Sequence, residues 1–162
     1  MLQSSNAHDM RSYQCTVAIS SPARKVYEAL TTPQGLQGWW TATCEVATDL
    51  GAESTFHFGR TCNIMRIERL VPGSEVRWRC VHQYHHAPGE LTHPDEWINT
   101  LLVFRLFAPT LASTLLDFEH VGLMPGLDCY EICERGWDHF LKHSLKNYVE
   151  IGQGDPYRET AA

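Results

Sequence analysis

The stretch DCYEICERGWDHFLKHSLKNYVEIGQGDP, residues 128–156, predicts one long amphipathic helix and thereby decides the fold. Apolar residues recur in it at intervals of three and four, which places their side chains on one side of a helix. These residues are Cys129, Ile132, Cys133, Trp137, Phe140, Leu141, Leu145, Tyr148 and Val149. Asp128 and Glu131 have the spacing of a capping box, and Gly152 marks the end of the pattern. We expect a helix of about 23 residues within about 126–150, roughly 34 Å long, which is enough to cross a whole sheet.

Upstream of this helix the sequence predicts an antiparallel sheet. Residues 13–20, YQCTVAIS, alternate between apolar and polar side chains, as half-buried strands do. Two short helical segments follow, over 23–31 and 34–40. Further strand-like segments are residues 44–49, 54–59, 63–71, 75–84, 96–107 and 114–121. This order is typical of an α+β fold, in which a curved antiparallel sheet of about six or seven strands wraps around the long C-terminal helix and leaves room for a cavity.

Length and composition indicate a single globular domain. The chain has 162 residues, of which 43% are hydrophobic and 20% are charged. We expect a flexible N-terminus over 1–11, one domain over 12–156 and a C-terminal tail over 157–162.

Charge and cysteine usage narrow the class of protein. The net charge of −6 argues against a nucleic-acid partner and against an anionic membrane surface. No apolar run of about 20 residues could span a bilayer, and the first residues lack the apolar core of a signal peptide. We therefore expect a reduced, cytoplasmic protein without disulfides. Its six cysteines are residues 15, 44, 62, 80, 129 and 133.

The order of the segments resembles the START-like (SRPBCC) superfamily, whose members have the helix-grip fold. The resemblance covers about residues 13–156 and rests on VYEALTTPQGLQGWW (26–40) and GWDHFLKHSLKNYVEIGQGDP (136–156). It is closest to the branch related to the activator of heat-shock-protein ATPase. EWINT (96–100), FEHVGLMP (118–125) and CYEICERGW (129–137) resemble a bacterial subgroup of that branch, to which we attach no function.

The resemblance implies an internal cavity under the long helix that binds a small hydrophobic or amphipathic molecule. From the residues themselves we expect no cofactor and no metal, because no set of potential ligands is complete. Other members of the superfamily are cyclases or hydrolases, and the fold alone does not choose between these activities. Residues expected at the cavity are Trp40, Phe56, Trp78, Cys80, Ile98, Thr100, Phe118, His120, Cys129, Cys133 and Trp137. A co-chaperone-like interaction module is a further alternative. It is weaker because the activator family's client contacts use an additional N-terminal domain. A homodimer is possible in each case.

An enzymatic alternative depends on His120 and Glu96. Strand alternation places His120 on the inner face with Leu116 and Phe118. Hairpin pairing places it roughly opposite residues 98–100, so that Glu96 becomes a diagonal neighbour. A carboxylate beside an imidazole in a cavity is a candidate acid/base pair, and equally a buried polar pair that satisfies itself.

Cys129 and Cys133 allow three interpretations. A thiol in the first turn of a helix has a lowered pKa, which predicts a reactive Cys129. A metal site with His120 would need a fourth ligand. The third interpretation is that both cysteines only pack beneath the helix. A second set of potential metal ligands, His82, His85, His86 and His93, lies in a polar segment that is typical of a solvated loop.

Overall fold

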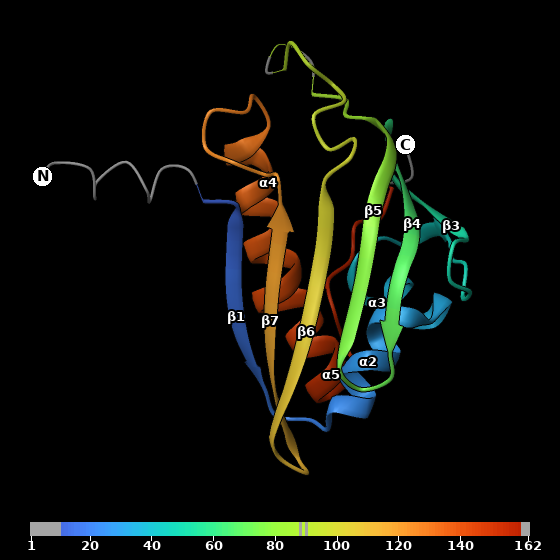
Figure 1. Ribbon diagram of the computed structural model, residues 1–162, viewed down its shortest axis with the longest axis vertical. Helices are drawn as coiled ribbons and strands as arrows, with labels where there is room; N and C mark the ends of the chain where they lie inside the picture. Colours follow the sequence, from blue (N-terminus) through green and yellow to red (C-terminus); the bar gives the residue numbers. More distant parts are fainter. Residues whose placement is uncertain (1–10, 88, 90, 160–162) are drawn as a thin grey trace, which may run out of the picture.

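The computed structural model describes residues 11–87, 89 and 91–159, and within them one antiparallel sheet wraps around a C-terminal helix (Figure 1). The sheet has the strand order β1-β7-β6-β5-β4-β3-β2. The strands are β1 Tyr13–Ile19, β2 Thr43–Glu45, β3 Glu53–Phe58, β4 Thr61–Val71, β5 Glu75–Tyr84, β6 Leu101–Thr110 and β7 Ser113–Val121. The predicted α+β helix-grip fold is confirmed. The N-terminus over 1–11 falls almost wholly outside the described residues.

The two short helices lie between β1 and β2 in the sequence. They are α2 Ala23–Thr31 and α3 Pro33–Trp39. Thr32 separates them in an extended conformation, which the following proline favours, and its hydroxyl accepts a hydrogen bond from the Gly35 backbone N–H at 3.0 Å. Trp39 is fully buried and donates its indole N–H to the Ala29 carbonyl at 2.8 Å, so the two helices form one unit beside the sheet.

The C-terminal helix runs behind the sheet as three consecutive segments (Figure 1). They are α4 Tyr130–Trp137, the π-helical η1 Asp138–Leu145, and α5 Lys146–Ile151. The wide turns of a π-helix are frequent near functional sites. Ser144 in η1 donates to the Trp39 carbonyl at 2.6 Å and accepts from the Asp155 N–H at 2.7 Å, so this segment holds both α3 and the chain that follows the helix.

The helix begins later than predicted, and its capping box is not formed. Cys129 is the N-cap residue and makes no side-chain capping bond. The Asp128 carboxylate instead accepts from the backbone N–H of Thr92 at 3.2 Å. Because Asp128 is engaged by a distant loop, the local Asp–Glu spacing did not identify the helix start.

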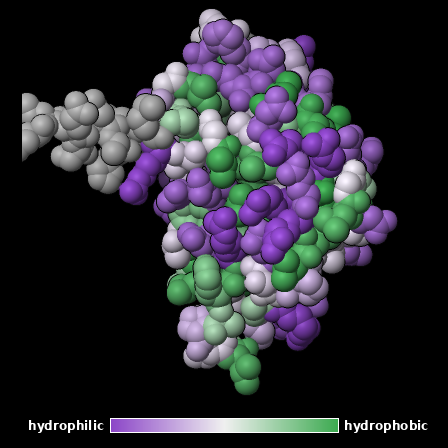
Figure 2. Space-filling view, viewed as in Figure 1, coloured by the Kyte–Doolittle hydropathy of each residue, from purple (hydrophilic) through white to green (hydrophobic). Residues whose placement is uncertain are grey.

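Alternation along the strands places the apolar side chains on the concave face, against the helix. In β1 the buried residues are Tyr13, Cys15, Val17 and Ile19, and their neighbours are exposed. In β7 the predicted inner residues Leu116, Phe118 and His120 are all fully buried. The outer face seen in Figure 2 is largely hydrophilic, with ion pairs such as Arg79–Glu68 at 2.6 Å between neighbouring strands.

The predicted strand over 96–107 is wrong in its first part. β6 starts at Leu101, and residues 94–99 form turns, with Asn99 at a positive φ of 73°. The Thr100 N–H bonds to the Trp97 carbonyl at 2.8 Å, which closes the last turn before the strand. Trp97 and Ile98 were predicted to lie in the strand because they are apolar, but they belong to the turn that precedes β6.

After α5 the chain reverses at Gly152 and returns to the sheet side of α3. Tyr157 forms a parallel bridge with Thr41, and its backbone N–H bonds to the Trp40 carbonyl at 2.9 Å. Contacts with the domain thus continue one residue past the predicted boundary at 156. Within the described residues, no helix has the length and apolar character needed to cross a membrane.

Candidate functional site

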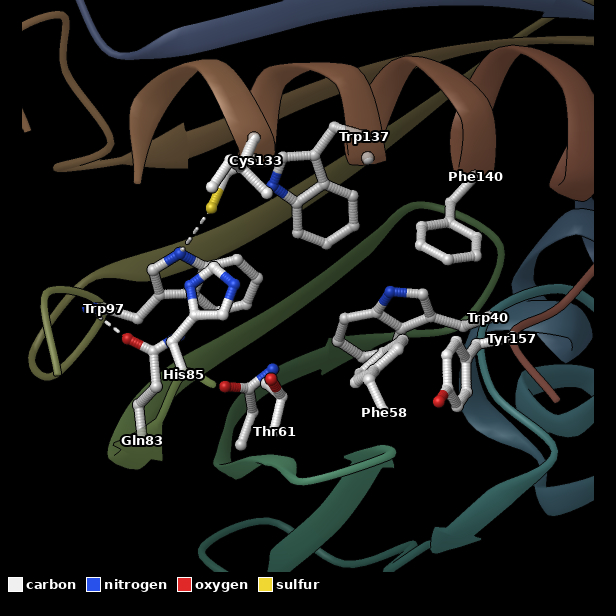
Figure 3. A pocket seen from close by; sticks show the side chains of 13 residues that line it. Trp40, Phe58, Thr61, Gln83, His85, Trp97, Cys133, Trp137, Phe140 and Tyr157 are labelled. Atoms are coloured by element: carbon white, nitrogen blue, oxygen red, sulfur yellow. Dashed lines mark hydrogen bonds between the residues drawn. The ribbon is translucent and has the colours of Figure 1, made fainter. Parts of the chain in front are cut away.

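A cavity of about 220 Å³ lies between the C-terminal helix and the concave face of β4 and β5 (Figure 3). The helix contributes side chains from α4 and η1, and the loop after β5 closes one end. Its lining residues are Trp40, Phe58, Thr61, Asn63, Gln83, His85, Trp97, Ile132, Cys133, Gly136, Trp137, Phe140 and Tyr157.

Aromatic rings form most of the wall. Trp137 stacks on Trp40, with ring centroids 5.5 Å apart, and on Trp97 at 5.8 Å. Phe58 packs against Phe140 at 6.0 Å and against Tyr157 at 5.7 Å. Figure 3 shows Trp40, Phe58, Phe140 and Tyr157 together at one end of the cavity. Such rings offer large apolar contact faces to a planar guest.

The position of Tyr157 depends on the β3–β4 hairpin. Gly59 has a φ of +64°, and a Cβ there would lie 2.7 Å from the Tyr157 hydroxyl oxygen. A residue without a side chain therefore permits both the turn and the close approach of Tyr157. This brings the residue after the predicted domain end to the rim of the cavity.

The other end of the cavity is polar. Thr61 and Asn63 come from the start of β4, Gln83 comes from the end of β5, and His85 directly follows that strand. Asn63 pairs directly with Gln83 across the two strands. The Gln83 side-chain oxygen accepts from the Trp97 backbone N–H at 2.8 Å. Asn63 Oδ1 and His85 Nδ1 are buried and have no hydrogen-bond partner among the described residues.

Trp97 connects the loop before β6 to the helix. Its indole N–H donates to the Cys133 sulfur at 3.3 Å, across the cavity wall (Figure 3). Trp97 is 7% exposed, so its indole points into the protein.

His120 is buried beside the cavity in a complete hydrogen-bond chain. Its Nδ1 accepts from the Trp137 indole at 3.1 Å, and its Nε2 lies 2.8 Å from the Thr100 hydroxyl. The Thr100 hydroxyl donates to the Trp97 carbonyl at 2.5 Å, so Nε2 carries the proton of a neutral imidazole. Burial lowers the pKa of His120 to about 3, which keeps the ring neutral at physiological pH.

The predicted pair of His120 with Glu96 is not formed. Glu96 accepts hydrogen bonds from the backbone N–H groups of Asp128 at 3.2 Å and Cys129 at 3.0 Å, at the start of α4. The strand partner of His120 is Leu102, so the register differs from the expected 98–100. Glu96 therefore caps free backbone N–H groups at the start of α4. Because its carboxylate does not contact His120, the two residues do not form the expected acid/base pair.

Of the residues expected at the cavity, Trp40, Cys133 and Trp137 line it. Ile98 is 36% exposed and lies in the loop. The remaining residues are buried without lining the cavity, and these are Phe56, Trp78, Cys80, Thr100, Phe118, His120 and Cys129.

The polar end of the cavity was not among the residues predicted from the sequence. Strand parity was an available signal, since Thr61 and Asn63 share the inner face with Met65. No such signal existed for Tyr157 because it follows the helix.

Cys129 is not an activated thiol. It is 1% exposed, and a hydrogen bond with Cys133 together with burial raises its pKa. The expected lowering of the Cys129 pKa is not found, because the hydrogen bond with Cys133 and burial raise it, and the Cys129 backbone N–H binds the Glu96 carboxylate. All six cysteines lie in the described part of the chain and are free thiols.

Within the described residues, His82, His85, His86 and His93 do not come together as one group of potential metal ligands. In the described parts of the chain, the group of three potential metal ligands within 4.8 Å of one another is His93, Glu96 and Asp128. His93 Nδ1 lies 2.9 Å from Asp128 Oδ2, and its side chain is 68% exposed. These three residues fasten the loop after β5 to the start of α4, next to Trp97.

Comparison with known proteins shows the family to which this chain belongs. Residues 20–150 match the family model "Activator of Hsp90 ATPase homolog 1-like protein". The chain belongs to this family. A comparison with curated proteins gives no match.

Solved structures share the fold of this family member. The Aha1 dimer from Colwellia psychrerythraea is 28% identical, with a TM-score of 0.73 over 90% of this chain and 100% of that chain. DynU16, from the dynemicin biosynthetic locus, is 20% identical with a TM-score of 0.64, over 87% of this chain and 48% of its own. An HSP90 activator from Plasmodium falciparum is 15% identical with a TM-score of 0.62, over 85% and 93%. The last two support the fold alone.

Proposed function

We propose that this family member binds a small, largely apolar molecule in the cavity beneath its C-terminal helix. The observation that carries the proposal is a cavity of about 220 Å³ with stacked indole walls. Pockets for small molecules combine such apolar walls with a few polar groups. The membership of a START-like branch agrees with this function.

Gly136 provides a direct test, because it lines the cavity and a Cβ there would meet no atom within 4 Å. Gly136→Leu should fill space that a ligand needs and should keep the fold, since glycine in a helix interior is the less favourable residue. Arg135→Leu, at an exposed neighbouring position, is the matched control.

Naphthalene is a suitable probe, with the indole N–H signals of Trp97 and Trp137 in ¹H–¹⁵N NMR spectra as reporters. Saturable shifts in the wild type and in Arg135→Leu, at least tenfold weaker in Gly136→Leu, support the proposal. Native mass spectrometry of gently purified protein would show a retained molecule. Equal binding by all three proteins would place the guest elsewhere and overturn the proposal.

We also propose that the chain forms a homodimer. The Colwellia psychrerythraea structure is described as a dimer. An exposed apolar surface is available at the tip of the β6–β7 hairpin, where Leu111 is 95%, Phe107 54% and Leu115 39% exposed. The tip is hydrophobic in Figure 2 and projects from the lower end of the sheet in Figure 1.

Sedimentation velocity would test this second proposal. Leu111→Ser combined with Phe107→Ser should shift the protein to monomer, and Leu50→Ser, at a loop residue that is 63% exposed, should not. A wild-type monomer at tens of micromolar would contradict it. We do not propose the co-chaperone-like alternative, because we identify no surface among the described residues that is specific to a heat-shock protein. A cytoplasmic location and a domain over 12–156 stay predictions from the sequence.

A further inference from the structure

We infer that the ligand of the cavity is a neutral aromatic molecule of one or two rings that carries a hydroxyl or N–H group. This inference rests on the proposed binding function and adds the chemical class of the ligand. It follows from three features: the size of the cavity, the placement of its polar residues, and two buried polar atoms that have no hydrogen-bond partner within the described part of the chain.

Size sets the number of rings. A cavity of roughly 150 Å³ in another protein holds benzene. The volume of about 220 Å³ found here therefore suits a single substituted ring or two fused rings. Trp40 and Trp97 both stack on Trp137 at interplanar angles of 23° and 12°, so the cavity wall presents nearly parallel indole planes. Flat guests make the largest contact with such planes.

The polar residues are confined to one end of an otherwise apolar concave face. Along β4 the inner face changes from Thr61 and Asn63 to Met65 and Ile67, which are 0% and 4% exposed. Gln83 is the cross-strand partner of Asn63, and the two are 4% and 3% exposed. Burial of amide side chains beside apolar surface is unfavourable unless their hydrogen bonds are made. A guest with a polar group at this end would complete those bonds.

The unpartnered atoms define what that polar group must do. Asn63 Oδ1 is an acceptor, so its complement is a donor. His85 Nδ1 either accepts or donates, depending on the tautomer of the ring. A hydroxyl group of the guest can donate to Asn63 Oδ1 and also accept from the His85 ring. An N–H group can only donate, so it would bind Asn63 Oδ1.

The charge of the lining disfavours an anionic guest. Among the lining residues that the structure describes there is no lysine or arginine, and the unpartnered amide oxygen would repel a carboxylate or phosphate. A purely apolar guest would leave that oxygen desolvated, which weakens binding. A neutral aromatic molecule with a hydroxyl or N–H group carries no negative charge and supplies the donor that the amide oxygen lacks.

Matched probes test the inference. In isothermal titration calorimetry the wild type should bind 2-naphthol about tenfold more tightly than 2-methoxynaphthalene, which has no donor. Asn63→Leu should reduce this ratio to about one, mainly through weaker 2-naphthol binding. Gln14→Leu, at an exposed residue of β1, should keep the wild-type ratio.

The outcomes separate this inference from the function on which it rests. Saturable binding of both probes with equal affinity to the wild type would overturn the ligand class and leave the binding function intact. Failure of naphthalene, 2-naphthol and 2-methoxynaphthalene to bind would overturn both. The wild-type ratio decides the matter even if Asn63→Leu does not fold.

Discussion

Trp137 donates its indole N–H to Nδ1 of His120 at 3.1 Å, and both rings are almost completely excluded from solvent. This contact joins the C-terminal helix to β7 at the inner side of the cavity wall. The Nε2–H group of His120 donates a hydrogen bond to the Thr100 hydroxyl oxygen, 2.8 Å away. The histidine therefore belongs to a structural hydrogen-bond chain that positions Trp137, and it is held neutral by burial.

His120 should make the fold sensitive to acid. Its pKa is lowered to about 3 in the folded state, whereas the unfolded chain binds a proton near 6.5. Its contribution to stability is therefore complete above pH 6.5 and is lost as pH falls from about 6.5 toward 3, by up to about 1.4 kcal/mol per pH unit. Urea unfolding at several pH values should show a flatter profile for His120→Leu, despite its lower stability at pH 7.

The exposed His143 gives the control for this experiment. His143→Gln should keep the wild-type pH profile. If the curves of His120→Leu and the wild type ran parallel between pH 6.5 and 4, another group would be responsible for the acid sensitivity.

Glu96 should stabilise the start of α4. Its carboxylate accepts two backbone N–H groups, those of Asp128 and Cys129. Glu96→Ala should lower the free energy of unfolding by about 1 kcal/mol, the usual cost of losing a capping group. Glu96→Gln should lose less because it keeps an acceptor. Asp95→Ala, at an exposed neighbour, should change little, and equal losses at both positions would argue against capping.

His93 should titrate above its ordinary range. A hydrogen bond and the nearby charge of Asp128 raise the pKa of His93. The folded state holds this proton more tightly, so the contribution of the pair is present below pH 6.5 and disappears as pH rises through the folded-state pKa. Hydrogen exchange in residues 91–97 should then be faster at pH 8 than at pH 6, after correction for the intrinsic rates.

NMR titration of the histidine ring would measure this pKa directly. Asp128→Asn should return the pKa of His93 toward 6.5, and Asp49→Asn, at a distant exposed carboxylate, should leave it raised. An unshifted His93 in the wild type would show that the contact with Asp128 is not maintained in solution.

Thiol alkylation should follow burial. Cys44 and Cys62 are half-buried, whereas Cys15, Cys80, Cys129 and Cys133 are buried. Burial raises the pKa of Cys44 to about 11 and that of Cys80 to about 12, so neither of these two thiols should react as a preformed thiolate at pH 7. Mass spectrometry after brief iodoacetamide treatment should find label first at Cys44 and Cys62. Faster labelling of Cys129 would restore the reactive-thiol hypothesis.

Asn63→Leu should stabilise the ligand-free protein. The Asn63 side-chain oxygen is buried without a partner, and leucine has a similar size without that desolvated acceptor. We expect the free energy of unfolding to rise by about 1 kcal/mol, at the expense of binding a hydroxylated guest. Thermal unfolding of the variant and of Gln14→Leu would test this. A strong destabilisation specific to Asn63→Leu would indicate that the amide is satisfied in solution.

Part of the candidate site was accessible from local pattern. Helical spacing placed Cys133 and Trp137 on the inner side of the C-terminal helix, and both line the cavity. Strand parity placed His120 inward, and it is fully buried. Its partner was misjudged because parity identifies a face but not a register, and Leu102 rather than residues 98–100 lies opposite His120.

The sequence by itself determined the order of elements, the α+β class and the apolar face of most strands, because hydrophobic periodicity is a local property of the chain. The family resemblance added the helix-grip fold. Only the tertiary structure decided how the cavity is built. Asn63 meets Gln83 across two strands, Glu96 caps a helix 33 residues further on, and Tyr157 returns to the rim beside Gly59. Such contacts depend on packing between segments far apart in the sequence, and no local pattern encodes which distant partner a buried polar group will find.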